Sequence, residues 1–340
     1  MKLITLSSLC CLIFSILWFS AQKQETFKFP QQSLKVTLTD NFFLQRYQNK
    51  HHKYGYINQE GVEVIKPQFD YASDFSEELA AVRVGNLSGY INVSGKVEIP
   101  LRNWSTFAFS EDLALVEVNE KFGYINKLGN IVISPVFDEA TYFREGLAAV
   151  KVGDKWGYIN QKGKFLIHLK YSEASEFTEG RAVVSYNNEK FLVDKSARVL
   201  TKFYFDEYFG FSGGLAGVSV AGKFGYIDRY GNLIIPTKFQ QALSFTEGVA
   251  GVYIVNKFGY IDKEGNTFID FQFEAGEPFS EGLAAVRKNG KWGFINKQGT
   301  FAIKPQFKSA SSFSHGLASV GTEEYGGFIN KQGQFVWRNN

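Results

Sequence analysis

The chain has 340 residues, 16% of which are aromatic, and its formal net charge at neutral pH is +3. So small a charge gives no basic footprint for nucleic acid, and a composition with 34 Phe, 17 Tyr and seven Pro favours strands over helix-rich or disordered classes. Length alone would predict two or three domains, but the internal repeats described below override that expectation.

The N-terminus reads as a secretory signal peptide. Lys2 precedes an apolar run, Leu3–Phe19, and Ser20-Ala21 offers small residues for cleavage. We therefore assign residues 1–21 to a signal peptide and predict export to the periplasm, the cell surface or the exterior. The alternative is an uncleaved anchor, because the apolar run approaches the length that spans a bilayer.

Cys10 and Cys11 are the two cysteines of the chain, and both lie in this segment. Ser7-Ser8-Leu9 before them is not a lipobox, so lipidation is not favoured. Once the segment is removed, the mature chain has no cysteine, which excludes disulfides, thiol chemistry and cysteine metal sites. Residues 22–42 show no repeat register and are assigned to a linker or N-terminal arm, and residues 43–340 to a β-repeat domain.

A glycine in the pattern G-[YF]-I-[ND] recurs along this domain in steps of 34 residues, with one double step. These marker glycines are Gly55, Gly89, Gly123, Gly157, Gly225, Gly259, Gly293 and Gly327. Phe191 stands at the missing position, so there are nine copies, and constant spacing implies one geometry for all. A second glycine follows each marker by six residues, as in Gly299, and the fifth copy has Ala197 there. The first copy, from Phe42, is expected to enter the register without a gap.

KWGYINQKG at 155–163 and KWGFINKQG at 291–299 resemble the WG-repeat (KWG-repeat) family of bacterial proteins. The connecting segments PQFDYASDFSEELAAV and FDEATYFREGLAAV resemble it as well, and the likeness covers roughly residues 43–337. The resemblance implies a repeat architecture rather than one reaction. Tyr54, Ser88, Lys190 and Gly326 replace the Trp or Phe of the signature.

Each copy is predicted to hold three short strands and two tight turns. In the eighth copy the strands are Leu283–Arg287, Lys291–Asn296 and Thr300–Ile303. Asn289-Gly290 between the first two is a hairpin signal, because both residues tolerate positive φ.

A second turn runs from Asn296 to Gly299, with the Asn side chain bonded to backbone and the Gly left-handed. An Asn or Asp occupies this position in every copy, which also permits a metal-ligand interpretation that we do not favour. The connector after Pro305 is predicted to be a short turn of helix or an irregular crossing, with Phe313 and Leu317 in the core.

A single three-stranded meander cannot bury enough surface alone, so neighbouring copies must stack. We predict an all-β array of nine 34-residue repeats, each a three-stranded antiparallel meander, stacked as an open twisted β-solenoid. The alternative is a closed β-propeller-like ring, which is disfavoured because propellers typically have 4–8 blades of four strands.

No residue is assigned a catalytic, cofactor-binding or metal-binding role, and no cofactor is predicted. Gly210–Gly214 matches G-x-S-x-G, but it occupies the columns of the ordinary repeat connector and lacks a strand-to-helix context. His51 and His52 are interpreted as part of a solvated basic loop rather than a metal site.

Two charged columns run through the copies. The glutamates are Glu77, Glu111, Glu145, Glu179, Glu247 and Glu281, and the lysines are Lys53, Lys121, Lys155, Lys223, Lys257 and Lys291. They could form a charged track for a polymer, but we favour structural pairing between the two columns, at little energy per pair.

These features predict a non-enzymatic exported repeat protein that presents an extended surface to a protein or an envelope polymer such as a polysaccharide. Nucleic acid is not an expected partner, and membrane contact is expected only if the N-terminal segment stays uncleaved. The alternative is a hydrolase of envelope polymers with its site near the degenerate fifth copy. That copy offers Glu189, Asp194, Asp206, Glu207 and Tyr208.

Overall fold

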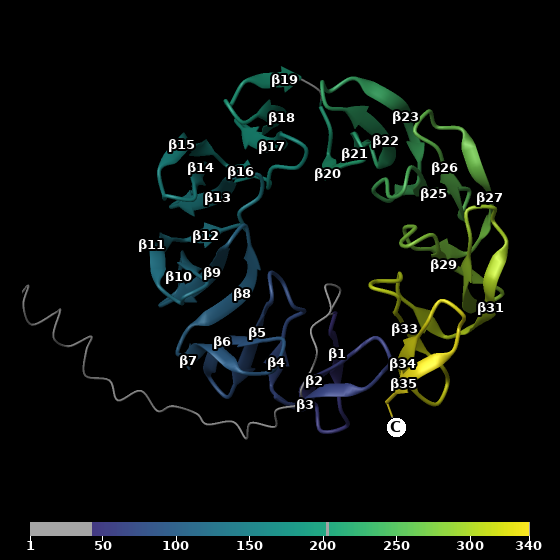
Figure 1. Cartoon of the computed structure of the whole chain (residues 1–340). Coiled ribbons are helices and arrows are strands. Elements are labelled where there is room, and N and C mark those ends of the chain that lie inside the picture. Colours follow the sequence, from purple (N-terminus) through teal and green to yellow (C-terminus); the bar gives the residue numbers. More distant parts are fainter. Residues whose placement is uncertain (1–42, 202–203, 340) are drawn as a thin grey trace, which may run out of the picture. The chain divides into compact units, whose positions relative to one another are not determined.

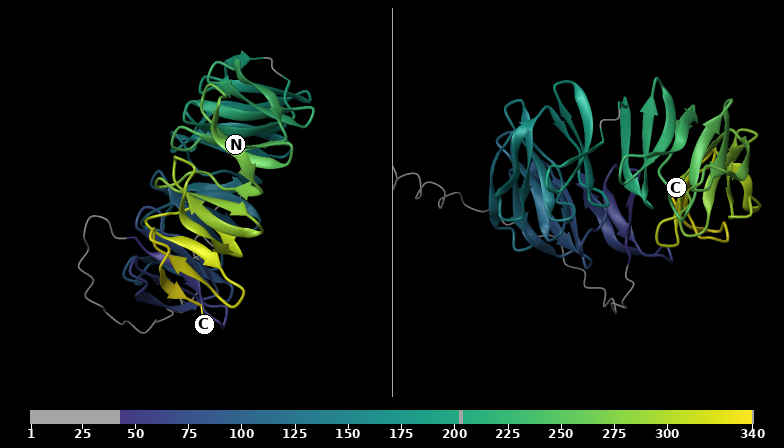
Figure 2. Two further views of the ribbon diagram at one scale, coloured as in Figure 1. Left: turned by 90° about the vertical axis from the view of Figure 1, so that its right-hand side faces the viewer. Right: turned by 90° about the horizontal axis from the view of Figure 1, so that it is seen from above.

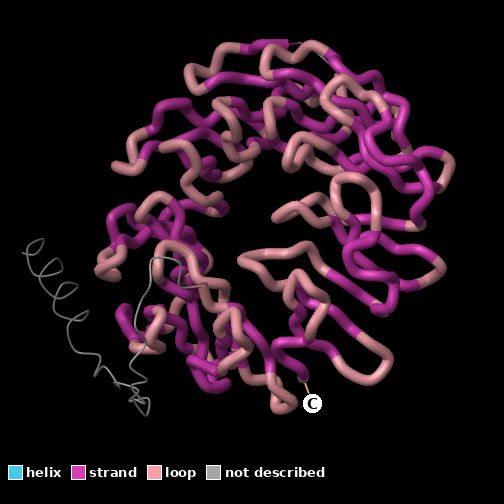
Figure 3. Tube along the Cα trace, turned by 45° about the vertical axis from the view of Figure 1, so that its right-hand side comes forward, coloured by secondary structure: helices cyan, strands magenta, loops and turns pink. Residues whose placement is uncertain are grey.

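The computed structural model describes residues 43–201 and 204–339. Contacts divide the chain into two units, Met1–Ser33 and Leu34–Asn340, and all described residues belong to the second. The predicted signal peptide, 1–21, and the predicted arm, 22–42, lie outside the described residues. The regular elements of the described part are all strands (Figure 3), and it holds no helix long and apolar enough to cross a membrane.

The strands form nine antiparallel sheets, which we call blades and number along the chain (Figure 1). The first three blades are blade 1 with β1 (Gln45–Gln48), β2 (Tyr54–Ile57) and β3 (Glu63–Phe69), blade 2 with β4 (Tyr71–Ala72), β5 (Leu79–Val84), β6 (Leu87–Asn92) and β7 (Val97–Arg102), and blade 3 with β8 (Ser105–Ser110), β9 (Leu113–Val118), β10 (Lys121–Asn126) and β11 (Ile131–Phe137). The next three are blade 4 with β12 (Glu139–Ala140), β13 (Leu147–Val152), β14 (Lys155–Asn160) and β15 (Phe165–Tyr171), blade 5 with β16 (Glu173–Ala174), β17 (Arg181–Tyr186), β18 (Glu189–Asp194) and β19 (Val199–Thr201), and blade 6 with β20 (Glu207–Ser212), β21 (Leu215–Val220), β22 (Lys223–Asp228) and β23 (Leu233–Phe239). The last three are blade 7 with β24 (Gln241–Ala242), β25 (Ala250–Ile254), β26 (Lys257–Ile261) and β27 (Thr267–Phe273), blade 8 with β28 (Ala275–Gly276), β29 (Ala284–Lys288), β30 (Lys291–Ile295) and β31 (Phe301–Phe307), and blade 9 with β32 (Ser309–Ala310), β33 (Ala318–Gly321), β34 (Gly326–Ile329) and β35 (Phe335–Arg338).

Within a blade the strands follow chain order, with the first toward the centre of the ring and the last at its rim (Figure 1). Seen from two further sides, the blades stand next to one another as separate twisted sheets (Figure 2). The chain passes directly from the rim of one blade to the inside of the next, as from Phe137 to Glu139. Blades 2 to 9 therefore have four strands, whereas a three-stranded meander was predicted.

The predicted open solenoid is wrong, and the alternative of a closed propeller-like ring is correct. Blades 8 and 9 are joined by a bond from Lys331 Nζ to the Glu281 carbonyl at 3.1 Å. The equivalent bond between blades 9 and 1 runs from Gln59 Nε2 to the His315 carbonyl at 2.9 Å. An apolar cluster also spans the closure, with Tyr47, Ile57, Leu317 and Phe328 as its buried members.

The core lies between blades rather than within them. Tyr158 of blade 4 packs on Phe177 of blade 5 with ring centroids 4.9 Å apart, and the same pair recurs around the ring. Phe313 and Leu317 are buried, as predicted. Their connector contains no helical turn; it forms the two-residue strand β32 and a bridge between Ser314 and Leu317.

The marker glycine is required by a close crossing of two strands. The third predicted strand extends beyond Ile303 to Phe307, and its register against β30 shifts on either side of Phe294 in a β-bulge. A Cβ added at Gly293 would lie 2.6 Å from the Ile303 carbonyl oxygen and 2.6 Å from the nitrogen of Pro305. Only glycine therefore allows the outer strand to pass.

The fifth copy has Phe191 at this position, and any side chain there obstructs the crossing. Among the described residues, which leave out 202–203, its outer strand β19 covers Val199–Thr201, whereas β23 in the next blade has seven residues. The turn between β18 and β19 nevertheless forms as in the other copies, because Ala197 takes a φ of 62° and its N–H donates to the Asp194 carbonyl at 2.9 Å.

The first copy does not enter the register without a gap. Gly55 pairs with Tyr47, eight residues earlier, whereas Gly89 pairs with Val82, seven residues earlier. The hairpin of blade 1 thus carries one extra residue in its turn, and His51 and His52 are exposed there.

Candidate functional site

A cleft of about 600 Å³ opens between blades 2 and 3. It is lined by residues from β4, β5, β6, β8 and β9, from the connection between β7 and β8, and from the two hairpin turns that follow β5 and β9. The residues are Tyr71, Arg83, Gly85, Asn86, Ser88, Asn103, Trp104, Ser105, Thr106, Phe107, Glu117, Asn119 and Glu120. We call it the Trp104 cleft.

The cleft lies where a tie between neighbouring blades is interrupted. Between blades 3 and 4, Asp138 accepts hydrogen bonds from Lys121 Nζ and, at 2.7 Å, from the N–H of Gly153 in the next hairpin turn. Trp104 and Leu87 occupy the positions of that aspartate and that lysine one repeat earlier. Neither side chain can hold the turn at Asn119, so the space beside it stays open.

Trp104 forms a fixed wall of the cleft. Its side chain is buried, and its Nε1–H donates to the Ser88 carbonyl at 2.7 Å. The Arg102 guanidinium lies over the ring, 4.9 Å from its centroid, at cation–π distance. Ser88 stands where most other copies have a large aromatic residue, and its small side chain makes room for the indole.

Two charged side chains in the cleft also lack the partners found elsewhere. In blade 4, Lys151 Nζ lies 2.6 Å from Glu139 Oε1. The equivalent pairs are Arg83 with Tyr71 in blade 2 and Glu117 with Ser105 in blade 3. After the hydrogen bond from Lys53, which is the larger cause, the Arg83 guanidinium contributes to lowering the pKa of Asp70, but neither it nor the Glu117 carboxylate forms a hydrogen bond or a close ion pair with a described residue, and both remain available to a ligand.

Tyr71 provides an accessible aromatic surface at the same place. Its side chain is 42% exposed and lies edge-on to Tyr54, with centroids 6.4 Å apart. A ring held by a neighbour but open on one side can accept a flat apolar surface. The cleft thus combines aromatic surface with unpaired donors and acceptors, as ligand sites commonly do.

The structure does not bring together the acidic residues of the fifth copy. Glu189 and Asp194 lie at opposite ends of β18, and Asp194 Oδ1 is engaged by the N–H groups of its own turn. Asp206 holds the turn at Ala221, with a hydrogen bond of 2.7 Å. Tyr208 alone of the five lines a smaller hollow of about 230 Å³, between blades 5 and 6.

The G-x-S-x-G match is part of the connector. Ser212 Oγ donates to the Phe245 carbonyl at 2.6 Å, the bond that Ser280 makes to Phe313 two repeats later. In the described part of the chain, no three His, Cys, Asp or Glu side chains group so that they could hold a metal ion.

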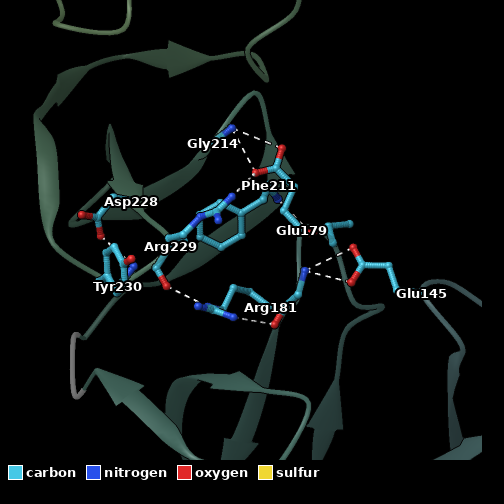
Figure 4. A network of polar contacts seen from close by, with 10 residues as sticks. Glu145, Glu179, Arg181, Phe211, Gly214, Asp228, Arg229 and Tyr230 are labelled. Atoms are coloured by element: carbon cyan, nitrogen blue, oxygen red, sulfur yellow. Dashed lines mark hydrogen bonds and ion pairs between the residues drawn. The ribbon is translucent and has the colours of Figure 1, made fainter.

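The two charged columns do not pair with each other, contrary to the prediction. Glu179 accepts a hydrogen bond of 3.0 Å from Gly214 N in the next blade, and Arg229 Nη2 lies 3.7 Å from the same carboxylate (Figure 4). Glu145 accepts from Gly180 N in the same way. Lys53 and Lys121 bind instead to Asp70 and Asp138. The glutamates of the column therefore join blades, and Lys53 and Lys121 pair with aspartates outside it.

Comparison with known proteins supports the repeat register. A family model described as WG containing repeat matches residues 54–87, 89–122, 122–156, 156–189, 191–224, 224–257, 258–292 and 292–323. No curated protein matches the chain in sequence.

Solved structures resemble the chain in fold. A crystal structure of "the eukaryotic initiation factor" has a TM-score of 0.67 and 12% identity, covering 88% of this chain and 96% of that one. Dihydro-heme d1 dehydrogenase NirN in complex with DHE has a TM-score of 0.49 and 12% identity, covering 88% and 73%. The extracellular domain of a putative one component system, BT4673 from B. thetaiotaomicron, has a TM-score of 0.36 and 10% identity, covering 86% and 53%. At these identities the first likeness shows the fold alone, and the other two carry no argument.

Proposed function

The chain belongs to the WG-repeat family, and from this premise we propose that it is an exported, non-enzymatic protein that binds an envelope polymer in the Trp104 cleft. The observation that carries the proposal is the coincidence of substitutions at this single place. Leu87, Ser88 and Trp104 each depart from a repeat column, and together they create the opening.

A structural role for these substitutions alone does not account for the polar lining. If the departures served only to pack a tryptophan, apolar neighbours would suffice. Instead, Arg83 and Glu117 stand without the ion pairs that their column makes in blade 4. Unpaired charged groups beside an exposed aromatic ring support recognition of a ligand.

A binding role is favoured over hydrolysis because three of the acidic residues of the fifth copy are engaged in local contacts, with Glu189 accepting a hydrogen bond from Tyr204. Asp194 and Asp206 each hold a turn. Export is proposed from the N-terminal sequence, in which Lys2 precedes the apolar run Leu3–Phe19. It places the protein in the periplasm, at the cell surface or outside the cell.

The test measures retention of envelope polymer by the immobilised protein. Solubilised envelope of the native host is passed over wild type and over the double variant Tyr71→Ala/Arg83→Ala. We expect the variant to lose retention. The matched control is Tyr230→Ala/Arg287→Ala, which removes an exposed tyrosine and the equivalent arginine of blade 8, and it should behave as wild type.

Equal retention by both double variants would contradict the assignment of the cleft. The eluate is also assayed for new reducing ends and free amino groups. Progressive release of either during incubation with wild type would replace the binding proposal with the hydrolase alternative.

A further inference from the structure

The chemistry of the Trp104 cleft also indicates which kind of polymer it takes. Resting on the function proposed above, we infer that the ligand is a neutral glycan, bound with one sugar ring against Tyr71 and its hydroxyl groups among the surrounding polar side chains. Three features of the lining lead to this inference.

The first feature is the arrangement of the aromatic residues. Tyr71 is exposed, while Phe107 is half-buried and Trp104 is buried in the wall. An exposed ring backed by an apolar wall fits a ligand with one flat C–H face and a polar perimeter. A pyranose ring has that shape, because its C–H groups lie on its faces and its hydroxyls around its edge.

The second feature is the abundance of groups that both donate and accept hydrogen bonds. Asn86, Asn103 and Asn119 are exposed at the cleft, each with an amide that offers two donors and one acceptor oxygen. Sugar hydroxyls likewise donate and accept at the same atom. Amides can therefore satisfy several hydroxyls without a net charge on either side.

The third feature is the balance of charge. The lining carries one guanidinium, Arg83, and two carboxylates, Glu117 and Glu120. An anionic sugar would meet the two carboxylates, and a cationic peptide would meet the guanidinium. A hydroxyl can accept from Arg83 and donate to Glu117 at once, so a neutral polyhydroxylated ligand engages both signs of charge.

The experiment divides the solubilised envelope of the native host into three pools. Protease-treated polysaccharide is separated by anion exchange into a neutral and an acidic pool, and the third pool holds envelope protein. Each pool is titrated against the full mature protein by calorimetry. We expect saturable binding of the neutral pool, weakened about tenfold in Tyr71→Ala by loss of the stacking surface.

Two further variants separate the ligand site from the fold. Tyr71→Phe keeps the ring and should retain most of the affinity, whereas Tyr230→Ala removes a still more exposed tyrosine elsewhere and should retain all of it. Unchanged thermal melting of Tyr71→Ala shows that its loss of binding is local.

The outcomes distinguish this inference from the proposed function. Binding confined to the acidic or the protein pool, and abolished by Tyr71→Ala, overturns the neutral glycan while leaving the cleft as a binding site. Binding of no pool, or binding that Tyr71→Ala leaves unchanged, overturns both.

Discussion

Six buried tyrosines share one position of the repeat and one hydrogen bond. Each donates from its hydroxyl to a carbonyl in the connector of the next blade, as Tyr158 does to Ser175 at 2.8 Å. The set is Tyr56, Tyr90, Tyr124, Tyr158, Tyr226 and Tyr260. Because the carbonyl belongs to the neighbouring blade, a residue that looks like ordinary core filling also joins successive blades.

These tyrosines predict loss of stability in alkali. Burial is the main cause that raises the pKa of each above the ordinary value. Above about pH 10 the unfolded chain loses protons that the folded chain keeps, so the free energy of unfolding falls with pH, by about 1.4 kcal/mol per pH unit for each such group. The stabilisation is thus complete below about pH 10 and is lost as the pH rises further.

Urea unfolding of wild type and Tyr158→Phe between about pH 9 and 11 measures this slope. The variant should lose about 1 kcal/mol at neutral pH with its hydrogen bond, yet show a shallower decline in alkali because one titrating group is gone. If the free energy of unfolding fell with pH at the same rate in the two proteins, folding would not protect Tyr158 from ionisation.

The marker glycine gives a second prediction at the residue scale. A Cβ at Gly327 would lie 2.3 Å from the Trp337 carbonyl, whereas a Cβ at Gly326 would have its nearest atom at 3.7 Å. Gly327→Ala should therefore cost about 2–4 kcal/mol of unfolding free energy, and Gly326→Ala should be neutral or slightly stabilising. Urea melts of the two neighbouring variants provide each other's control, and equal losses would refute the close crossing.

At the scale of elements, the hairpin turns show how far a local signal reaches. The Asn296 to Gly299 turn was predicted correctly, because side chain and backbone of four adjacent residues decide it: Gly299 N donates to the Asn296 carbonyl at 2.9 Å, and Gly299 has a φ of 74°. The end of the last strand was not predicted. The strand was predicted to end at Ile303, before Pro305, but it continues to Phe307 because a bulge opposite Gly293 accommodates a residue without an N–H.

The two-residue inner strands were also missed, for a different reason. Ser309 and Ala310 pair with Gly321 and Val320, a partnership that no periodicity within a stretch this short can reveal. Elements that depend on a distant partner rather than on their own pattern therefore remained undetected.

Val255 lies in a hairpin turn and has a strained backbone conformation, which can be tested by comparison with the equivalent turn of the next blade. It takes a φ of 46° with a side chain 80% exposed, whereas Asn289 takes the equivalent place in the next blade at 51°. A β-branched residue is disfavoured in this region, where Asn is tolerated. Val255→Asn should raise the free energy of unfolding by about 1 kcal/mol, and Asn289→Val should lower it by about as much.

Thermal and urea melts of both variants test the sign. Because Val255 is exposed, little packing is lost with it. If Val255→Asn were destabilising, a contact of the valine side chain would have to outweigh the backbone strain.

At the scale of the whole molecule, the sequence showed nine equivalent units but not their closure. Each blade packs against its two neighbours in the ring. The array closes only if the rotation from each blade to the next is about 40°, so that nine such rotations complete a circle. The sequence of a single repeat does not determine this total rotation. The closure is seen where the Gln59 side chain of the first blade donates to the His315 carbonyl of the last.

The position of the cleft was hidden for a related reason. The fifth copy attracted attention because it lacks the marker glycine, yet that loss shortens only β19. The cleft arises from Trp104 in a column whose aspartate ties adjacent blades, a role seen at Asp138. Ser88 was noted as a departure from the repeat, but its structural consequence depends on Trp104, 16 residues away in the sequence, which donates to the Ser88 carbonyl.

Closure makes the stability of distant blades interdependent. Separating blades 6 to 9 from the rest of the ring exposes two blade faces. In the intact ring, the face at the boundary with blade 5 buries the cluster around Phe211, and the face at the closure buries the cluster around Phe328. Full-length protein should unfold in one transition. A fragment holding blades 6 to 9, Phe205–Asn340, should aggregate or show little cooperative structure, since four blades cannot close with the angle of nine.

The control is a circular permutant that is cut at the same place. It begins at Phe205, joins Asn339 to Phe43 through a short flexible linker and ends at Thr201, so it keeps all nine blades. The shared apolar cluster, in which Val183 and Leu192 of blade 5 lie with Phe211 of blade 6, would then close the ring without a covalent link. Circular dichroism and amide exchange should show a native, cooperative permutant beside an unstructured fragment. A soluble fragment with protected amides and its own sharp transition would instead mean that each blade depends only on its nearest neighbours, and that closing the ring adds little to its stability.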